Sequence, residues 1–395
     1  MTAWNDPDLD ALSETTRRFA QQHILPYQNE WESSGQVPRE LSAEAGKLGL
    51  LGAGFPESAG GGGGGARAAT AVSEALHEVG AGGGVVSALF TTGISLPHII
   101  AAGHPDQITK WVKPALRGEM IGSLGITEPS GGSDVGRLRT SAVRDGDEWV
   151  INGEKTFITS GARADFVVTA VRTGVAGSQG ISLIVVPTDT PGFTVAKTLD
   201  KLGWRSSDTA ELVYQDVRVP VENLVGEENK GFQLISHAFV TERLTLASQA
   251  YATAQRCLDL AIQWTRDRET FGQPLITRQA VQNTLSQMAQ KIDVARVYTR
   301  DLATRWDRAT QDASDNTPGP FGSLDIVAHA CFAKNQAVEG AEWVVYQAQQ
   351  LFGGLGYMTE AEVEKHYRDI RILAIGGGTT EILTTLAAKK LGMVG

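Results

Sequence analysis

The chain has 395 residues, of which 42% are hydrophobic and 20% are charged, and its formal net charge at pH 7 is −10. This composition is ordinary for a globular chain of two or three domains, and it excludes disordered and fibrous proteins. Because the charge is acidic and the sequence holds no dense basic cluster, we expect no nucleic-acid partner.

The start of the chain, residues 1–20, is acidic and amphipathic and lacks the apolar stretch of a signal peptide. No later run reaches the roughly 18 consecutive apolar residues that a membrane-spanning helix needs. The two cysteines, Cys257 and Cys331, lie far apart in helix-like sequence, which indicates reduced core residues. We therefore expect a cytoplasmic protein that does not bind a membrane.

Residues 1–122 are dominated by helix-compatible sequence, most clearly at 8–24, 39–51 and 66–79, with short Gly and Pro breaks between them. A six-glycine run at 60–65 formally contains the GxGxxG pattern of dinucleotide sites. It does not follow a strand and lacks the surrounding strand–helix–strand pattern, so we expect a flexible loop and no phosphate site.

Residues 123–228 change to a period of two, which is typical of strands. The dipeptides Asp145-Gly146 and Asn152-Gly153 predict hairpin turns. Strand-like runs follow at 166–173, 181–189, 192–199 and 211–220. The pattern predicts an antiparallel β domain with short connections.

Residues 229–395 return to helical sequence. Apolar residues recur at spacings of three and four, with one seven-residue step, at Val281, Leu285, Met288, Ile292, Ala295, Leu302 and Trp306. This spacing places them on one face of a long helix and predicts a helical bundle. The polar stretch 311–320, which contains Pro and Gly, would connect two helices of the bundle.

Five segments place small, hydroxylated or basic residues where they could hold a large polar ligand. They are 124–134, 155–161, 266–280, 349–357 and 375–381. In the third segment, Arg268 ends a helix and offers a guanidinium suited to a bidentate phosphate contact. In the last, three glycines allow a ligand to approach the backbone, and the amides that open the next helix would face its polar atoms.

The combination and order of these segments resemble the acyl-CoA dehydrogenase family over essentially the whole chain. The stretch ITEPSGGSD is similar to the family's TEPxxGSD signature, and RETFGQPL, QLFGGLGY and IGGGTTEI are similar to its C-terminal motifs. The resemblance implies an α+β fold with an N-terminal helical domain (1–122), a middle antiparallel β domain (123–228) and a C-terminal four-helix bundle (229–395). It also implies FAD as cofactor, held without a Rossmann fold.

The resemblance assigns site residues position by position. One set would line the flavin ring: Leu124, Ile126, Thr127, Gly132, Ser133, Phe157, Ile158 and Thr159. A second set would contact the adenine and diphosphate end, mostly from a neighbouring subunit: Arg268, Thr270, Phe271, Arg278, Gln279, Gln350, Leu351, Gly353 and Gly354, completed by Thr379 and Glu381. Acyl-CoA contact positions match Ser133, Arg243, Gly377 and Gly378. The seven histidines show no metal-ligand spacing, so we predict no metal.

The reaction requires a base beside the carbon next to the thioester, and a desolvated Glu with a raised pKa can serve. Most family members have that Glu at the position of Gly377, which cannot act as a base. A minority branch, which includes the isovaleryl-CoA and long-chain dehydrogenases, has it on an earlier helix in a Glu-Arg-Leu pattern, matched here by residues 242–244. The resemblance therefore assigns Glu242 as the base. The alternatives are Glu381, whose position in its motif matches a flavin contact, and a purely solvated Glu242 paired with a nearby Arg.

The resemblance implies α,β-dehydrogenation of an acyl-CoA to the trans-2-enoyl-CoA by a homotetramer, with electrons passed to an electron-transfer flavoprotein. The thioester oxygen would be polarised by a flavin hydroxyl and the Gly377 amide. Alternatives of the same fold are an acyl-CoA oxidase and a flavin monooxygenase, although a monooxygenase would not need Glu242. An alternative from another class is a flavin-empty scaffold protein. The sequence does not determine the length or branching of the acyl group.

Overall fold

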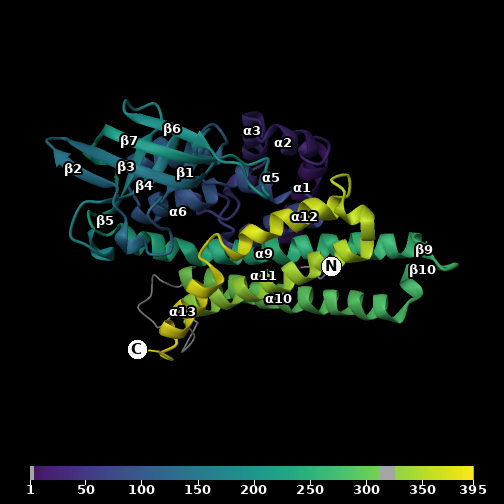
Figure 1. Cartoon of the computed structure of the whole chain (residues 1–395). Helices are drawn as coiled ribbons and strands as arrows, with labels where there is room; N and C mark the ends of the chain where they lie inside the picture. Colours follow the sequence, from purple (N-terminus) through teal and green to yellow (C-terminus); the bar gives the residue numbers. More distant parts are fainter. Residues whose placement is uncertain (1–3, 312–324, 395) are drawn as a thin grey trace.

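The computed structural model describes residues 4–311 and 325–394 (Figure 1). Short N-terminal helices and a β-sheet lie side by side along a set of long helices. The predicted order of a helical, a β and a second helical region is confirmed.

The first region consists of α1 (Pro7–His23), α2 (Gln28–Ser34), α3 (Arg39–Lys47), α4 (Gly65–Glu78), α5 (Gly83–Leu89), α6 (Thr92–Ala102), α7 (Pro105–Gln107) and α8 (Lys113–Leu116). Helix α1 begins after Asp6, whose side chain accepts hydrogen bonds from the first backbone amides of the helix. The helices predicted at 8–24 and 66–79 are confirmed to within one residue. The helix predicted at 39–51 ends at Lys47, because Gly49 adopts a φ of 72° and starts a separate 3₁₀ turn.

The glycine run 60–65 is a hydrogen-bonded turn, which corrects the prediction of a flexible loop. The amides of residues 61–64 donate to backbone carbonyls within residues 52–56. A Cβ on Gly61 would lie 2.3 Å from the carbonyl oxygen of Phe55. Glycine is required because two stretches of backbone touch here, and the amides of residues 61–64 are already used.

The segment Gly83–Ala102 has the length and composition of a membrane-spanning helix, with a mean hydropathy of 1.6. The structure divides it into α5 and α6, and 56% of its apolar window is buried inside the protein. Core helices of globular proteins have the same composition, so this segment is weak evidence for a membrane.

One sheet contains β1 (Gly122–Gly125), β2 (Ser141–Asp145), β3 (Glu148–Thr159), β4 (Phe166–Arg172), β5 (Ile181–Pro187), β6 (Phe193–Thr198), β7 (Thr209–Pro220) and β8 (Leu224–Val225). The strand order is β6-β7-β3-β2-β4-β5-β8, with β1 paired to β4. The four predicted strand runs are confirmed, and most neighbours are antiparallel as expected. Strand β4, however, pairs in parallel with β1 and β2, which the sequence did not predict.

Only one of the two predicted hairpin turns is present. Asp145 pairs with Glu148 at the end of the β2–β3 hairpin, so that prediction is confirmed. The prediction at Asn152-Gly153 is wrong, because this dipeptide lies inside β3 at a break in the register with β7. A Cβ on Gly153 would lie 2.6 Å from the Cα of Thr140, so this glycine allows a close approach of two backbones.

The long helices are α9 (Gly231–Asp267), α10 (Gln279–Gln311) and α11 (Ile326–Phe352), which pack together with α13 (Thr380–Lys390), while α12 (Glu362–Ile370) lies between the bundle and α5. Six of the seven residues of the predicted apolar face of α10 are buried and Trp306 is partly buried, which confirms the face. Cys257 and Cys331 are free and buried, as predicted. The predicted connection 311–320 lies outside the described residues, apart from Gln311.

A buried carboxylate joins the N-terminal helices to the bundle. Glu74 of α4 is 3% exposed and accepts two hydrogen bonds from the guanidinium of Arg300 on α10, at 2.8 and 2.7 Å. It also accepts a hydrogen bond from the hydroxyl of Tyr251 on α9. One charge-assisted network therefore fixes three helices relative to each other.

Candidate active site

Glu242 lies near the start of α9 and faces the glycine loop that precedes α13. Two residues of this loop have backbones that favour glycine, with φ values of 65° at Gly377 and 97° at Gly378. A Cβ on Gly377 would lie 3.3 Å from Glu242 Oε1 and 2.4 Å from Leu246 Cδ1. The fold thus brings the Glu-Arg-Leu segment and the glycine loop to one place.

The Glu242 carboxyl has the electrostatics of a base that works near neutrality. Burial raises its pKa to about 7, and the opposing attraction of Arg243 and Lys334 is weaker. The side chain keeps part of its surface accessible, and it forms no hydrogen bond with the described residues. Its oxygens are therefore available to an incoming group.

Arg243, the next residue, is 5% exposed. Its guanidinium lies over the ring of Phe239 at 5.5 Å, and its Nε and Nη1 have no hydrogen-bond acceptor within the described parts of the chain. A buried guanidinium without acceptors is costly, so we expect an acceptor from outside these residues to complete it.

The predicted alternative base, Glu381, has the opposite environment. It lies exposed in the first turn of α13. Hydrogen bonds from its own backbone amide and from Thr379 lower the pKa of its carboxyl. A solvated carboxylate of this kind is a weak base, which favours Glu242 over Glu381.

Lys334 on α11 is a site residue that the motifs did not reveal. Its ammonium is fully buried and donates a hydrogen bond to the carbonyl of Gly378 at 2.9 Å. The signal in the sequence was a lysine four residues after Ala330 and three before Ala337, on the buried face of an apolar helix.

The residues predicted to line the flavin ring lie in and after β1 and at the end of β3. The segment 126–127 follows β1, and the carbonyl of Thr127 accepts a hydrogen bond from the amide of Thr156 on β3. At the end of β3, Phe157 is 68% exposed and has a φ of 59° beside a break in the strand register. Such a strained, exposed aromatic is typical of a ligand-contact position. Gly132 and Ser133, which follow Thr127 in the same segment, are exposed.

One member of this set points elsewhere. The side chain of Ile158 is 2% exposed and packs into the core of the β domain, so only its backbone is available to a ligand. The neighbouring Thr159 is half-buried, and its carbonyl accepts a hydrogen bond from Ser123 Oγ at 2.6 Å.

Most of the second predicted set lies at the far end of the bundle, where Figure 1 shows β9 (Glu269–Thr270) and β10 (Gln273–Pro274). Thr379 and Glu381, which complete this set, lie instead at the start of α13, beside the glycine loop. Arg278 Nη2 donates to the carbonyl of Thr270 at 2.7 Å, and its guanidinium lies 6.0 Å from the ring of Phe271, which is 99% exposed. Trp264 Nε1 donates to the carbonyl of Leu351 at 3.0 Å. This bond brings the segment 350–354 beside the 268–279 segment.

Glu242 and the residues at the far end of the bundle are far apart within one chain. Glu242 lies in α9, and Arg268 is the C-cap of the same helix, 26 positions later. At about 1.5 Å per residue they are roughly 39 Å apart. No atom lies within 4 Å of where a Cβ would be at Gly353 or Gly354, so the backbone at this far end is open.

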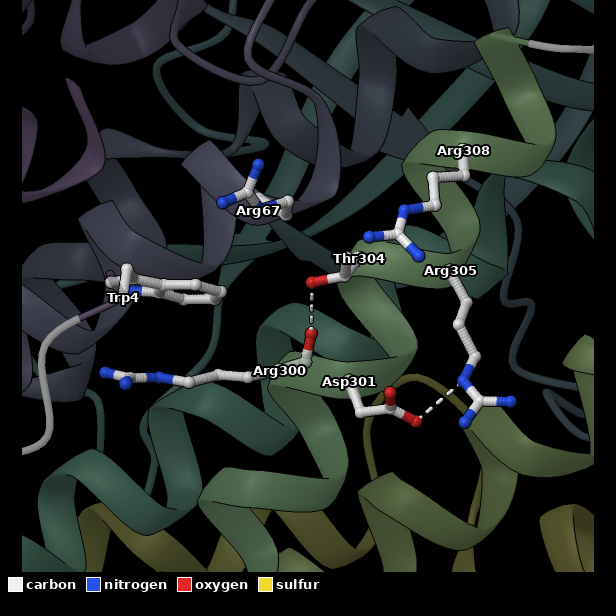
Figure 2. A pocket seen from close by; sticks show the side chains of 7 residues that line it. All are labelled: Trp4, Arg67, Arg300, Asp301, Thr304, Arg305 and Arg308. Carbon is white, nitrogen blue, oxygen red and sulfur yellow. Dashed lines mark hydrogen bonds and ion pairs between the residues drawn. The ribbon is translucent and has the colours of Figure 1, made fainter. Parts of the chain in front are cut away.

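A separate hollow of about 410 Å³ lies between α4, α10 and the N-terminal segment (Figure 2). It is lined by Trp4, Arg67, Arg300, Asp301, Thr304, Arg305 and Arg308. Three of its guanidiniums already pair with carboxylates: Arg67 with Asp6, Arg300 with Glu74, and Arg305 with Asp301. None of the lining residues belongs to the Glu242 site, so we assign this hollow no part in the reaction.

Comparison with known proteins identifies the fold and the family. Three family models match the chain: the N-terminal domain of acyl-CoA dehydrogenases over residues 6–119, the middle domain over 123–217 and the C-terminal domain over 229–392. The chain belongs to the acyl-CoA dehydrogenase family. The predicted three-domain fold and the predicted enzyme class are confirmed.

Individual relatives of this acyl-CoA dehydrogenase agree over nearly the full length. A probable acyl-CoA dehydrogenase of Bacillus subtilis (strain 168) is 37% identical and is covered to 97%, with 96% of this chain aligned. The structure of a probable acyl-CoA dehydrogenase from Mycobacterium abscessus has a TM-score of 0.93 at 53% identity, covering 99% of this chain and 100% of that chain. A glutaryl-CoA dehydrogenase from Mycobacterium smegmatis in complex with FADH2 has a TM-score of 0.85 at 28% identity, covering 98% and 94%.

Among the described residues, no group of three or more His, Cys, Asp or Glu side chains could hold a metal ion.

Proposed function

We propose that this acyl-CoA dehydrogenase binds FAD and that Glu242 removes the α-proton of an acyl-CoA, giving the trans-2-enoyl-CoA. The observation that carries the proposal is the position of the Glu242 carboxylate, against the glycine loop and with a pKa raised to about 7 by burial. The family membership and the relative that binds FADH2 support FAD as the cofactor.

The residues present fit such a cofactor. The exposed ring of Phe157 would cover the flavin, with Leu124, Ile126, Thr127, Gly132, Ser133, the Ile158 backbone and Thr159 beside it. Arg268, Thr270, Phe271, Arg278, Gln279, Gln350, Leu351, Gly353 and Gly354 would hold the adenine and diphosphate end, with Thr379 and Glu381. The bound flavin supplies the hydride acceptor. The chain supplies the proton acceptor and the geometry.

The chain's own groups would act on the thioester as follows. The backbone amide of Gly377 makes no hydrogen bond to the described residues, so it is available to the thioester oxygen, as the resemblance implies. Polarising that oxygen makes the α-proton more acidic. Glu242 Oε1 then takes the proton, and the closely packed Leu246 helps to exclude water. Arg243 and Ser133 would contact the acyl-CoA, and the unpaired Nε and Nη1 of Arg243 support this role.

The separation of the two cofactor sets supports a homo-oligomer, which we propose is a tetramer. One chain places Arg268 roughly 39 Å from Glu242 along α9, so a cofactor beside Glu242 would take its far-end contacts from a neighbouring chain. Exposed apolar side chains at the far end, Phe271, Leu355, Tyr357 and Met358, would then be covered by the partner.

One experiment can identify both the acyl group of the substrate and the electron acceptor. Relatives of similar identity include the rat long-chain enzyme at 35% and the human short-chain enzyme at 36%. A chain from the structure of an electron transferring flavoprotein of Acidaminococcus fermentans, at 31% identity, supports electron-transfer flavoprotein as the acceptor, whereas an oxidase of prolyl acyl carrier protein is 26% identical.

The experiment is anaerobic mixing of the yellow protein with a panel of straight and branched acyl-CoAs. Bleaching of the flavin and formation of enoyl-CoA would establish the reaction and rank the substrates. Fast re-oxidation of the reduced flavin by electron-transfer flavoprotein, together with slow re-oxidation by oxygen, would distinguish a dehydrogenase from an oxidase. A protein that takes up no FAD would refute the proposal and favour a scaffold role.

A further inference from the structure

Lys334 is an unusual charge for its position. It lies on α11 among buried alanines, and its side chain has no exposed surface. Its Nζ donates to the carbonyl of Gly378, which follows Gly377 in the glycine loop. No carboxylate oxygen of the described residues lies within 4.0 Å of its Nζ. A buried ammonium held by a neutral carbonyl alone is costly.

We propose that Lys334 is a positioning residue of this site, whose ammonium ties the glycine loop to α11 and keeps the Glu242 carboxylate in its ionised form. The proposal deepens the proposed function and rests on it, because it concerns the state of the residue assigned as the base. Nothing in the family motifs points to Lys334, since its signal is burial and geometry.

The first half of the role follows from the backbone. Gly377 and Gly378 both have positive φ values, and glycine has little conformational preference of its own. The loop is fixed on one side by the amide of Gly376, which donates to Ile372 O, and on the other by Thr379, the N-cap of α13. The bond from Lys334 fixes the carbonyl between these two points. It therefore fixes the peptide that joins residues 378 and 379, two peptide units after the one that carries the Gly377 amide.

The second half follows from the surrounding charges. The pKa of Glu242 is raised to about 7, because the effect of burial outweighs the attraction of Arg243 on α9 and of Lys334 on α11. The pKa of Lys334 is lowered to about 8, because the effects of burial and of Arg243 outweigh the opposing attraction of Glu242, Cys331 and Glu342. From α13, Glu381 also interacts with Lys334. The carboxylate of Glu242 and the ammonium of Lys334 therefore each stabilise the charged form of the other.

The test removes the charge and the hydrogen bond separately. Lys334→Gln keeps a donor for the Gly378 carbonyl but has no charge, and Lys334→Met loses both. Lys389→Gln, at the exposed end of α13, is the matched control for loss of one lysine. Each FAD-loaded protein is titrated between pH 5 and 9 by infrared spectroscopy of protonated carboxyl groups, and the Glu242 band is the one that Glu242→Gln removes. Flavin reduction by acyl-CoA is followed over the same pH range.

We expect both Lys334 variants to raise the midpoint of the Glu242 band and the acid limb of the rate by about one pH unit. Lys334→Met should also lower the maximal rate, because the loop has lost its tie, and Lys389→Gln should change neither. An unshifted infrared midpoint in folded Lys334→Gln would overturn the proposal. A shifted infrared midpoint with an unshifted rate limb would support Lys334 and refute Glu242 as the base, so the two proposals fail separately.

Discussion

The Glu242 carboxylate lies beside the position that a side chain at residue 377 would occupy. A Cβ on residue 377 would lie 3.3 Å from Glu242 Oε1, although the two residues belong to α9 and to the loop before α13. The resemblance to the family places the usual base at residue 377 and the minority base at residue 242. The structure gives the reason that one can replace the other, because a side chain at either position reaches the same place.

Replacement of Glu242 by Gln should abolish proton removal while preserving the fold. The amide keeps the shape of the side chain, so the protein should remain yellow, but flavin reduction should slow by a factor of about 10² to 10⁴. Stopped-flow bleaching with saturating acyl-CoA measures this rate. Glu381→Gln is the matched control, and any effect of that change should appear as weaker FAD retention. Near-normal reduction by Glu242→Gln would show that the proton leaves by another route.

Moving the carboxylate to residue 377 should restore activity only when room is made for it. The double change Glu242→Gly with Gly377→Glu removes one clash, but the new Cβ would still lie 2.4 Å from Leu246 Cδ1. The positive φ at residue 377 adds about 1–2 kcal/mol of backbone strain.

We therefore expect the triple variant that includes Leu246→Ala to reduce its flavin faster than the double variant. Its preference should shift toward unbranched acyl chains, because the new side chain fills space beside the thioester. Equal rates for the double and triple variants would mean that Leu246 moves aside without cost.

Glu242 should reduce the stability of the protein above acidic pH. Its pKa is raised from 4.5 to about 7 in the folded state, so the folded protein holds a proton that the unfolded chain releases. The stabilising contribution is full below pH 4.5 and is lost as the pH rises toward 7. The urea midpoint of Glu242→Gln, minus that of the wild type, should grow between pH 4.5 and 7 and then level off. A constant difference would contradict the raised pKa.

Loss of Arg268 should weaken cofactor retention. The proposed charge-assisted contact with the diphosphate contributes about 1.5–3 kcal/mol, which corresponds to a Kd for FAD raised about 10- to 150-fold in Arg268→Ala. Fluorescence titration of the apoprotein with FAD measures the change. Arg266→Ala, exposed in the last turn of the same helix, is the control and should bind FAD normally. Equal affinities of the two variants would remove Arg268 from the site.

The proposed division of each site between two chains predicts complementation. Glu242→Gln and Arg268→Ala subunits are separately defective, but in a mixed pair one site receives both defects and the other receives neither. Random mixing should therefore restore about one site in four. The assay uses an FAD concentration at which Arg268→Ala alone does not retain the cofactor. Activity after unfolding and refolding the two variants together, compared with each alone, measures this. No recovery would indicate that each site is built from a single chain.

Local sequence by itself determined the elements and most of their faces. The apolar spacing along 281–306 fixes the buried side of α10, because a helix repeats every 3.6 residues whatever surrounds it. The strand runs and the glycine loop before Thr379 are likewise local, and the motifs named residues 242 and 377 as the two positions where the base of this family occurs. Local rules failed where a glycine served a distant neighbour. Gly153 resembles a turn residue, yet it is needed because the backbone of Thr140 passes close to it.

The tertiary structure alone decided which charges meet. Lys334 and Glu242 lie on different helices, and no spacing rule connects them, but the packing of α9 on α11 places them within electrostatic reach. The same packing half-buries Glu242 and leaves Glu381 exposed, so the pKa of the Glu242 carboxyl is raised and that of the Glu381 carboxyl is lowered. Burial is a property of everything that surrounds a residue, and for that reason the sequence could nominate the base but only the fold could tune it.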